Sequence, residues 1–107
     1  MDKHMREYKK LKEDYPKEIL LYQVGIFYKV MFEDAKRTAD VTGLKLLVSG
    51  EASGPVPVCG FPLSGLDKYV GKMLRNGFAV AICPQTKDSD GRIRREISEV
   101  LTLSCST

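Results

Sequence analysis

One stretch of the chain decides its fold: Val24-Gly25-Ile26-Phe27-Tyr28-Lys29-Val30-Met31-Phe32-Glu33-Asp34-Ala35-Lys36-Arg37. Its hydrophobic period changes midway. Residues 26–31 are typical of a strand, whereas Phe32, Ala35 and Ala39 share one face at helical spacing. The helix is expected to end near Gly43, a residue type that suits a helix C-terminus. A strand that leads directly into a helix predicts an α/β fold.

The rest of the chain continues this alternation of strands and helices. Pro16 ends an expected helix over residues 2–14, and a second amphipathic helix follows Ser64, its expected N-cap, and stops at Asn76-Gly77. Short apolar or alternating runs predict the strands, at residues 19–24, 26–31, 44–48, 56–61, 78–83 and 94–103.

Two stretches between these elements carry turn-forming residues. Residues 49–57 contain two glycines and two prolines and predict a surface loop, and residues 86–91 predict a polar turn. No other stretch has the composition of a linker, so residues 1–107 are expected to form one domain without an internal boundary. The predicted architecture is an α/β domain with a mixed sheet of about five to six strands and about three flanking helices.

The composition excludes several classes of protein. Three widely spaced cysteines (Cys59, Cys83 and Cys105) and a single histidine, His4, argue against a disulfide framework or a zinc site, so no metal or cofactor is expected. Cys59 and Cys83 are expected to be buried. No apolar run approaches ~18 residues and no secretion signal is visible, which predicts a cytoplasmic protein with no membrane contact. A net charge of +3 is compatible with a polyanionic partner.

The strand at residues 26–31 sets two aromatic rings beside a cation, an arrangement typical of surfaces that meet nucleic acid. If the strand is regular, Tyr28 points to the face opposite Phe27 and Lys29 and belongs to the core. Two alternatives remain open: Phe27 could be a buried strand residue, and Lys29 a solvated lysine at a sheet edge. The cluster Arg92, Arg94 and Arg95 is expected to be a solvated strand end.

Motifs along nearly all 107 residues resemble one known domain. The segment from Gly25 to Arg37 resembles the Gly-x-Phe-Tyr-Glu and Asp-Ala-Lys-Arg motifs of the N-terminal, mismatch-recognition domain of the MutS family of DNA mismatch repair proteins. Further matching positions lie on both sides: Tyr8, Leu11-Lys12, Pro16, Glu18-Ile19-Leu20-Leu21, Pro55-Val56-Pro57-Val58-Cys59-Gly60-Phe61-Pro62, Tyr69, Gly77 and Ala79-Val80-Ala81-Ile82-Cys83.

This resemblance implies a DNA-binding module. Phe27 matches the family's Phe, which enters the minor groove and stacks on a mispaired base while the duplex is kinked. An apolar wedge must unstack a base step, and a mismatch has already lost part of that stacking energy, so selectivity follows from a lower deformation cost. Gly25 and Ser53 are expected to contribute further DNA contacts at the turn and in the Gly-rich loop.

The chain departs from the family pattern at Lys29, which occupies the position of the family's Glu. A carboxylate accepts hydrogen bonds and repels phosphates, whereas an ammonium group only donates and favours binding to any duplex. Weaker mismatch discrimination is therefore expected. The run Leu47-Val48-Ser49 also replaces the family's Thr-Lys-Arg, and the loss of two cations should weaken backbone contacts.

The sequence predicts binding rather than catalysis. It lacks a Gly-x-x-x-x-Gly-Lys-Ser/Thr phosphate loop, so the ATPase of full-length MutS proteins lies outside these residues. The expected partners are double-stranded DNA, mismatched or kinked, and other mismatch repair proteins; DNA binding would place the protein on the nucleoid. The alternative is a protein-interaction or structural module that has lost mismatch recognition. Met1 and the absence of a C-terminal Pro-Gly favour a solitary protein over a fragment.

Overall fold

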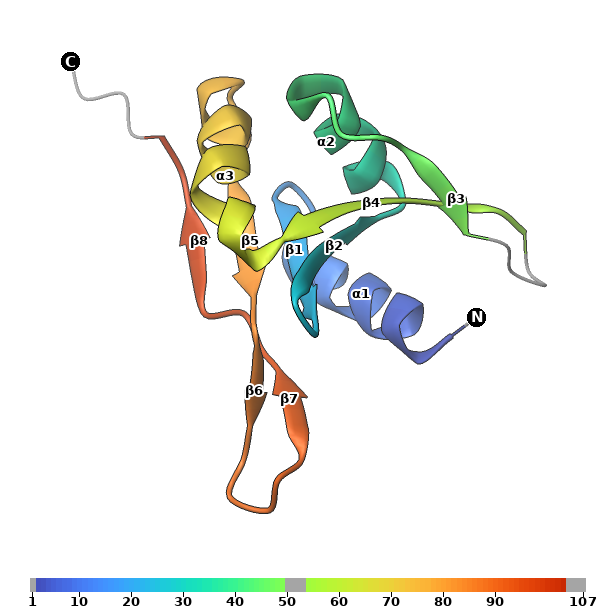
Figure 1. The fold of residues 1–107 in the computed structure, drawn as a ribbon, viewed down its shortest axis with the longest axis vertical. Coiled ribbons are helices and arrows are strands. Elements are labelled where there is room, and N and C mark those ends of the chain that lie inside the picture. Colours follow the sequence, from blue (N-terminus) through green and yellow to red (C-terminus); the bar gives the residue numbers. More distant parts are fainter. Residues whose placement is uncertain (1, 50–53, 104–107) are drawn as a thin grey trace.

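The computed structural model describes residues 2–49 and 54–103, and it alternates strands with helices as the sequence predicts (Figure 1). The helices are α1 (Lys3–Asp14), α2 (Glu33–Thr42), the short 3-10 helix η1 (Leu63–Gly65) and α3 (Leu66–Arg75). The strands are β1 (Ile19–Val24), β2 (Phe27–Met31), β3 (Leu47–Ser49), β4 (Val56–Pro62), β5 (Val80–Cys83), β6 (Gln85–Lys87), β7 (Ile93–Arg95) and β8 (Glu99–Leu101).

A mixed sheet forms the centre of the domain. Among the described residues it has six strands in the order β3-β4-β2-β1-β5-β8, with β1 and β5 parallel and the other neighbours antiparallel. This confirms the predicted α/β class, the mixed sheet and the three flanking helices. The strands β6 and β7 form a separate two-stranded sheet, a hairpin that extends away from the main sheet (Figure 1).

The helices lie on both faces of the sheet, α2 and α3 on one and α1 on the other (Figure 1). Strand β1 shows the two environments, because its successive side chains point to opposite faces. Ile19 and Leu21 pack with residues of α2 and α3, while Leu20 and Tyr22 pack with Met5 of α1. All four strand residues are fully buried, so β1 is the centre of both cores.

Asp34 joins α1 to the sheet. Its carboxylate is only 2% exposed and accepts hydrogen bonds from the Tyr8 hydroxyl at 3.0 Å and the Leu20 amide at 3.0 Å. The Lys12 ammonium lies 3.0 Å from the same carboxylate and also donates to the carbonyl of Glu18. Burial, and next the charge of Asp34, raise the pKa of Tyr8 well above its ordinary value, so its hydroxyl stays protonated as a donor.

Two sequence-based expectations about the C-terminal half are wrong. The strand expected at 94–103 is divided into β7 and β8, which belong to different sheets. The chain leaves the hairpin at Arg95 and rejoins the main sheet where the Ser98 amide donates to the carbonyl of Ile82 at 2.9 Å. The expected turn at 86–91 is shorter, because Asp88 accepts from the Asp90 and Arg92 amides and closes it tightly, which leaves room for β6.

Two smaller boundaries also differ from the sequence-based expectation. The third strand begins at Leu47 rather than at residue 44 and pairs with β4 through Ser49. Ser64 lies inside η1, and Gly65 is the N-cap of α3 without a side-chain hydrogen bond, because the 3-10 turn leads directly into the helix. The expected end of α2 is confirmed: Gly43 follows it with a φ of 78°.

Candidate nucleic-acid interface

The turn between β1 and β2 presents the candidate site. Val24 pairs with Phe27, so Gly25 and Ile26 form a two-residue hairpin loop. Gly25 has a φ of 62°, which a side chain would disfavour, while Ile26 lies outside the left-handed region, as in a type II′ turn. Ile26 is 70% exposed at the tip. Gly25 therefore acts through the backbone: it allows the tight turn after which Phe27 begins β2.

The alternation of β2 separates its aromatic residues. Tyr28 is 6% exposed and packs its ring against Phe61, with ring centroids 5.9 Å apart, so the prediction that it belongs to the core is confirmed. Phe27, on the opposite face, is 44% exposed, so the alternative that placed it in the core is wrong. Lys29 points to the same open face as Phe27 and is also exposed.

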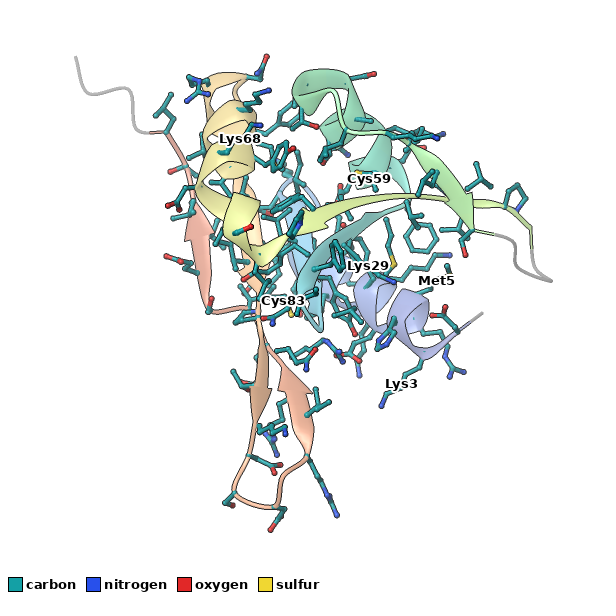
Figure 2. All side chains as sticks on the ribbon, in the orientation of Figure 1. Lys3, Met5, Lys29, Cys59, Lys68 and Cys83 are labelled. Atoms are coloured by element: carbon teal, nitrogen blue, oxygen red, sulfur yellow. The ribbon has the colours of Figure 1, made fainter. Side chains whose placement is uncertain are left out.

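A groove of about 350 Å³ lies beside Phe27 and Lys29, between the start of α1 and the strands β2, β3 and β4. Figure 2 shows Lys29 on β2 and Met5 on α1, which line this groove from its two sides. Its walls are mostly apolar and its rim carries charge. The lining residues are Asp2, His4, Met5, Phe27, Lys29, Met31, Leu47, Ser49, Val58, Cys59 and Gly60.

Charged groups of both signs lie near this groove. Nδ1 of His4 lies 3.2 Å from the Tyr22 hydroxyl, and the Arg95 guanidinium stacks over the Tyr22 ring at 5.0 Å. Burial, and next the charge of Arg95, lower the pKa of His4, with Lys29 adding to the effect and Asp2 opposing it. Among the residues that line the groove, Lys29 is an exposed cation that can contact an anionic partner, and Asp2 is an exposed anion.

Gly60 lines the groove beside Lys29 without a side chain. It pairs with Lys29 across β2 and β4, and a Cβ at Gly60 would lie 2.7 Å from the backbone oxygen of Tyr28. No side chain fits there without displacing the strand. At residue 60, therefore, β4 lines the groove with backbone alone.

A polar network, which we call the clasp, holds the β1–β2 turn against the β6–β7 hairpin. It consists of Gln23, Gly25, Gln85 and Arg95. The expectation that the whole arginine cluster is a solvated strand end is therefore wrong for Arg95, whose guanidinium is partly buried and donates to the carbonyl of Gln23 at 2.6 Å. The expectation is confirmed for Arg92 and Arg94, which are exposed.

The structure brings together three of the four predicted site residues. Phe27 and Lys29 share one face, and Gly25 shapes the turn before them. Ser53 lies outside the described residues. The sequence reading missed His4 as a groove residue, because nothing local shows that the start of α1 lies beside β2.

The two described cysteines are buried and chemically quiet. Burial raises the pKa of Cys59 and of Cys83 to about 11, which keeps both thiols protonated at neutral pH, as expected for small core residues. Cys105 lies outside the described residues.

Within residues 2–49 and 54–103, no group of three or more His, Cys, Asp and Glu side chains could hold a metal ion. In that part of the chain, no helix is long and apolar enough to cross a membrane.

Comparison with known proteins points to one family. The family model described as MutS domain I matches residues 2–107. Proteins named DNA mismatch repair protein MutS are similar to the chain: that of Desulfosudis oleivorans is 37% identical over 102 residues, and that of Synechococcus sp. is 39% identical over 104 residues. That of Fusobacterium nucleatum is 39% identical over 102 residues. These alignments cover 92% of the chain but only 11–12% of the relatives' length.

Proposed function

The chain belongs to the MutS domain I family, and from this membership we propose that it is a DNA-binding module of mismatch repair with Phe27 as its minor-groove wedge. The observation that carries the proposal is the exposure of Phe27, 44%, on a strand whose neighbouring Tyr28 is buried. An exposed ring directly after a tight turn can enter a base step without any rearrangement of the core.

Lys29 determines how selective this wedge is. Its ammonium donates to phosphate oxygens or to minor-groove acceptors, which every duplex offers, whereas the carboxylate expected at this position would repel phosphates. Lys29 therefore adds affinity for matched and mismatched DNA alike. We propose a module that prefers mismatched or kinked duplexes because they deform easily, with less discrimination than a carboxylate at residue 29 would give.

These residues have a binding role and no catalytic step in this proposal. The full-length relatives are much longer than the chain. If a longer protein contains this chain, we propose that it carries the ATPase, binds other repair proteins and assembles with them. For a DNA-binding module of this kind we predict a cytoplasmic location, on the nucleoid when DNA is bound.

Fluorescence anisotropy of a labelled duplex with one G·T mismatch, compared with its matched twin at two salt concentrations, tests the proposal. Phe27→Ala should abolish the preference for the mismatch and lower affinity for it by about 5- to 150-fold, because stacking on a base contributes ~1–3 kcal/mol. Val100→Ala is the matched control, since Val100 is 42% exposed on β8, at the far edge of the sheet. Equal effects of the two substitutions would contradict the wedge.

Lys29→Glu separates affinity from selectivity in the same assay. It should weaken binding to both duplexes and lower the slope of log affinity against log salt by about one, since one phosphate contact is lost. The ratio between mismatched and matched affinity should rise. An unchanged ratio would mean that residue 29 does not face the DNA.

One observation favours a second candidate function, a protein-interaction module. Strand β3 is an edge strand with two exposed apolar side chains, Leu47 at 51% and Val48 at 65%. Exposed apolar edges of this kind pair with other chains. This candidate is preferred if the wild-type chain binds neither duplex at low salt.

A further inference from the structure

The clasp connects the hairpin β6–β7 to the turn that carries Phe27. The Gly25 amide donates to Oε1 of Gln85 at 2.8 Å, and the Gln85 amide donates in turn to Oε1 of Gln23 at 2.8 Å. Nε2 of Gln23 donates to the carbonyl of Gly25 at 2.9 Å. The turn is thus held by side chains and not only by the ladder between its own strands.

Arg95 closes this network. Its Nε donates to the carbonyl of Gln23 at 2.6 Å and its Nη2 donates to Oε1 of Gln85 at 3.0 Å. The same Gln85 oxygen therefore receives both Arg95 and the Gly25 amide. The guanidinium carbon also lies over the Tyr22 ring, 5.0 Å from its centroid, which adds a cation–π contact. Without Arg95, the Gln85 side chain would lose the group that orients it toward Gly25.

On the other side of the turn, the Leu63 amide donates to the carbonyl of Ile26 at 2.9 Å. Phe27 itself is held by little packing, because nearly half of its side chain is exposed. Its direction therefore depends on the backbone of the turn. A turn clamped from both sides keeps an exposed ring ordered before it meets a ligand, which reduces the entropy lost on binding.

From these contacts we infer that Arg95 is a positioning residue for Phe27: through Gln85 and Gly25 it fixes the turn that aims the ring at DNA. The inference rests on the proposed function for its consequence in DNA binding. It differs from a direct phosphate contact, because Arg95 is partly buried and two of its nitrogens are engaged inside the protein.

The first test needs no DNA. Hydrogen exchange of the Gly25 amide, followed by NMR, should be at least about tenfold faster in Arg95→Ala, since the hydrogen bond that protects it loses its support. Arg94→Ala is the matched control: the side chain of this exposed neighbour pairs with Asp88 and Glu96, outside the clasp, and its loss should leave the exchange of the Gly25 amide unchanged. Unchanged exchange in Arg95→Ala would overturn the inference.

The second test is a double-mutant cycle in DNA binding with Phe27→Ala. Arg95→Ala should reduce the affinity for the G·T duplex about as much as Phe27→Ala does, and by less than about twofold in the Phe27→Ala background, because the two residues act as one unit. Arg95→Lys, which keeps the charge but not the planar fork, should behave like Arg95→Ala. Gln85→Ala repeats the test if Arg95→Ala does not fold.

The outcomes separate the inference from the proposed function. If Phe27→Ala leaves both duplexes unaffected, the proposed function fails and the positioning role fails with it. If Phe27→Ala removes the mismatch preference but Arg95→Ala weakens binding equally in both backgrounds, the proposed function stands and the inference is overturned, because Arg95 then contacts DNA by itself.

Discussion

The two faces of β2 differ in how completely they are covered. Tyr28 and Val30 lie beneath α2 and α3 and are buried, whereas Phe27 and Lys29 on the opposite face remain exposed. Each face of the strand carries one aromatic residue, Phe27 on the exposed face and Tyr28 on the buried face. Residue type alone therefore does not show which face is buried. The difference comes from the helices: α2 and α3 cover one face of β2, whereas α1 leaves Phe27 and Lys29 on the other face exposed. An exposed surface can therefore arise where a helical layer covers only part of a sheet.

The length of α1 explains why one face stays open. Its 12 residues make a rod of about 18 Å, while a six-stranded sheet is about 24 Å wide. The buried residues that pack with α1 include Leu20 and Tyr22 of β1 and Ala81 of β5. The groove beside Phe27 begins where this coverage ends.

Removing the carboxylate that joins the two layers should have the largest effect. Asp34→Ala removes the acceptor of the Leu20 amide and leaves the partly buried Lys12 ammonium without its carboxylate partner, and it should lower the free energy of unfolding by about 3–5 kcal/mol in urea denaturation. Glu33→Ala is the control, since this adjacent carboxylate is 72% exposed and its loss should stay within about 0.5 kcal/mol. Similar losses would mean that α1 is not docked through Asp34.

The contrast between the faces of β2 can be measured directly by truncating its two aromatic residues. Tyr28→Ala should lower the free energy of unfolding by about 3–5 kcal/mol, because it empties a packed core position beside Phe61. Phe27→Ala should cost less than about 1 kcal/mol and instead affect DNA binding. Equal losses of unfolding free energy in urea denaturation would contradict the difference in burial between the two faces of β2.

A methyl group at Gly60 would test how tightly the open face is built. Gly60→Ala places a Cβ 2.7 Å from the Tyr28 backbone oxygen and should lower the free energy of unfolding by about 1–3 kcal/mol. Gly71→Ala is the matched substitution on the covered side: its Cβ would meet only the flexible end of Arg75 at 3.1 Å. Within α3 it should raise the free energy of unfolding by up to about 1 kcal/mol. Thermal unfolding of both variants checks the two signs.

The smallest expected effect is a pH dependence at the start of α1. Burial and the nearby Arg95 lower the pKa of His4, so the folded state binds the His4 proton less tightly than the unfolded state. Stability should therefore fall as pH drops through the ordinary value of 6.5 toward the lowered value. His4→Gln should reduce the difference in unfolding free energy between about pH 7.5 and about pH 5.5. A difference as large as that of the wild type would exclude His4 as its source.

Local patterns in the sequence predict most of the fold. The helices α1 and α3 follow from their apolar periodicity, and β1, β2, β4 and β5 from short runs between turn residues. The division of the last predicted strand is not local, because Arg95 is tied to Gln23, a residue far away in the sequence. The start of β3 does not follow from the local pattern, because Leu44 and Leu46 are as apolar as Leu47 and Val48 and no turn residue separates them.

The sequence predicts only part of the candidate site: it indicates Phe27 and Lys29 but not the contacts of Arg95. Alternation shows that Phe27 and Tyr28 point to opposite faces, but it does not show which face a helix covers. The resemblance to MutS suggested Phe27 as the exposed residue, and its burial state agrees. The role of Arg95 could not be predicted, since its charge resembles that of its exposed neighbours Arg92 and Arg94, and only the fold brings it to the turn.

The parallel pairing of β1 with β5 has a consequence for biosynthesis. Ile19 pairs with Val80, about sixty residues later in the chain. At a synthesis rate of ~5–20 residues per second, the apolar edge of β1 waits about 3–12 seconds on the ribosome for its partner strand. A hairpin of β1 and β2 formed during that interval would have an unpaired edge that other chains could join. We therefore expect chaperones to protect this edge of β1 while the chain is being made.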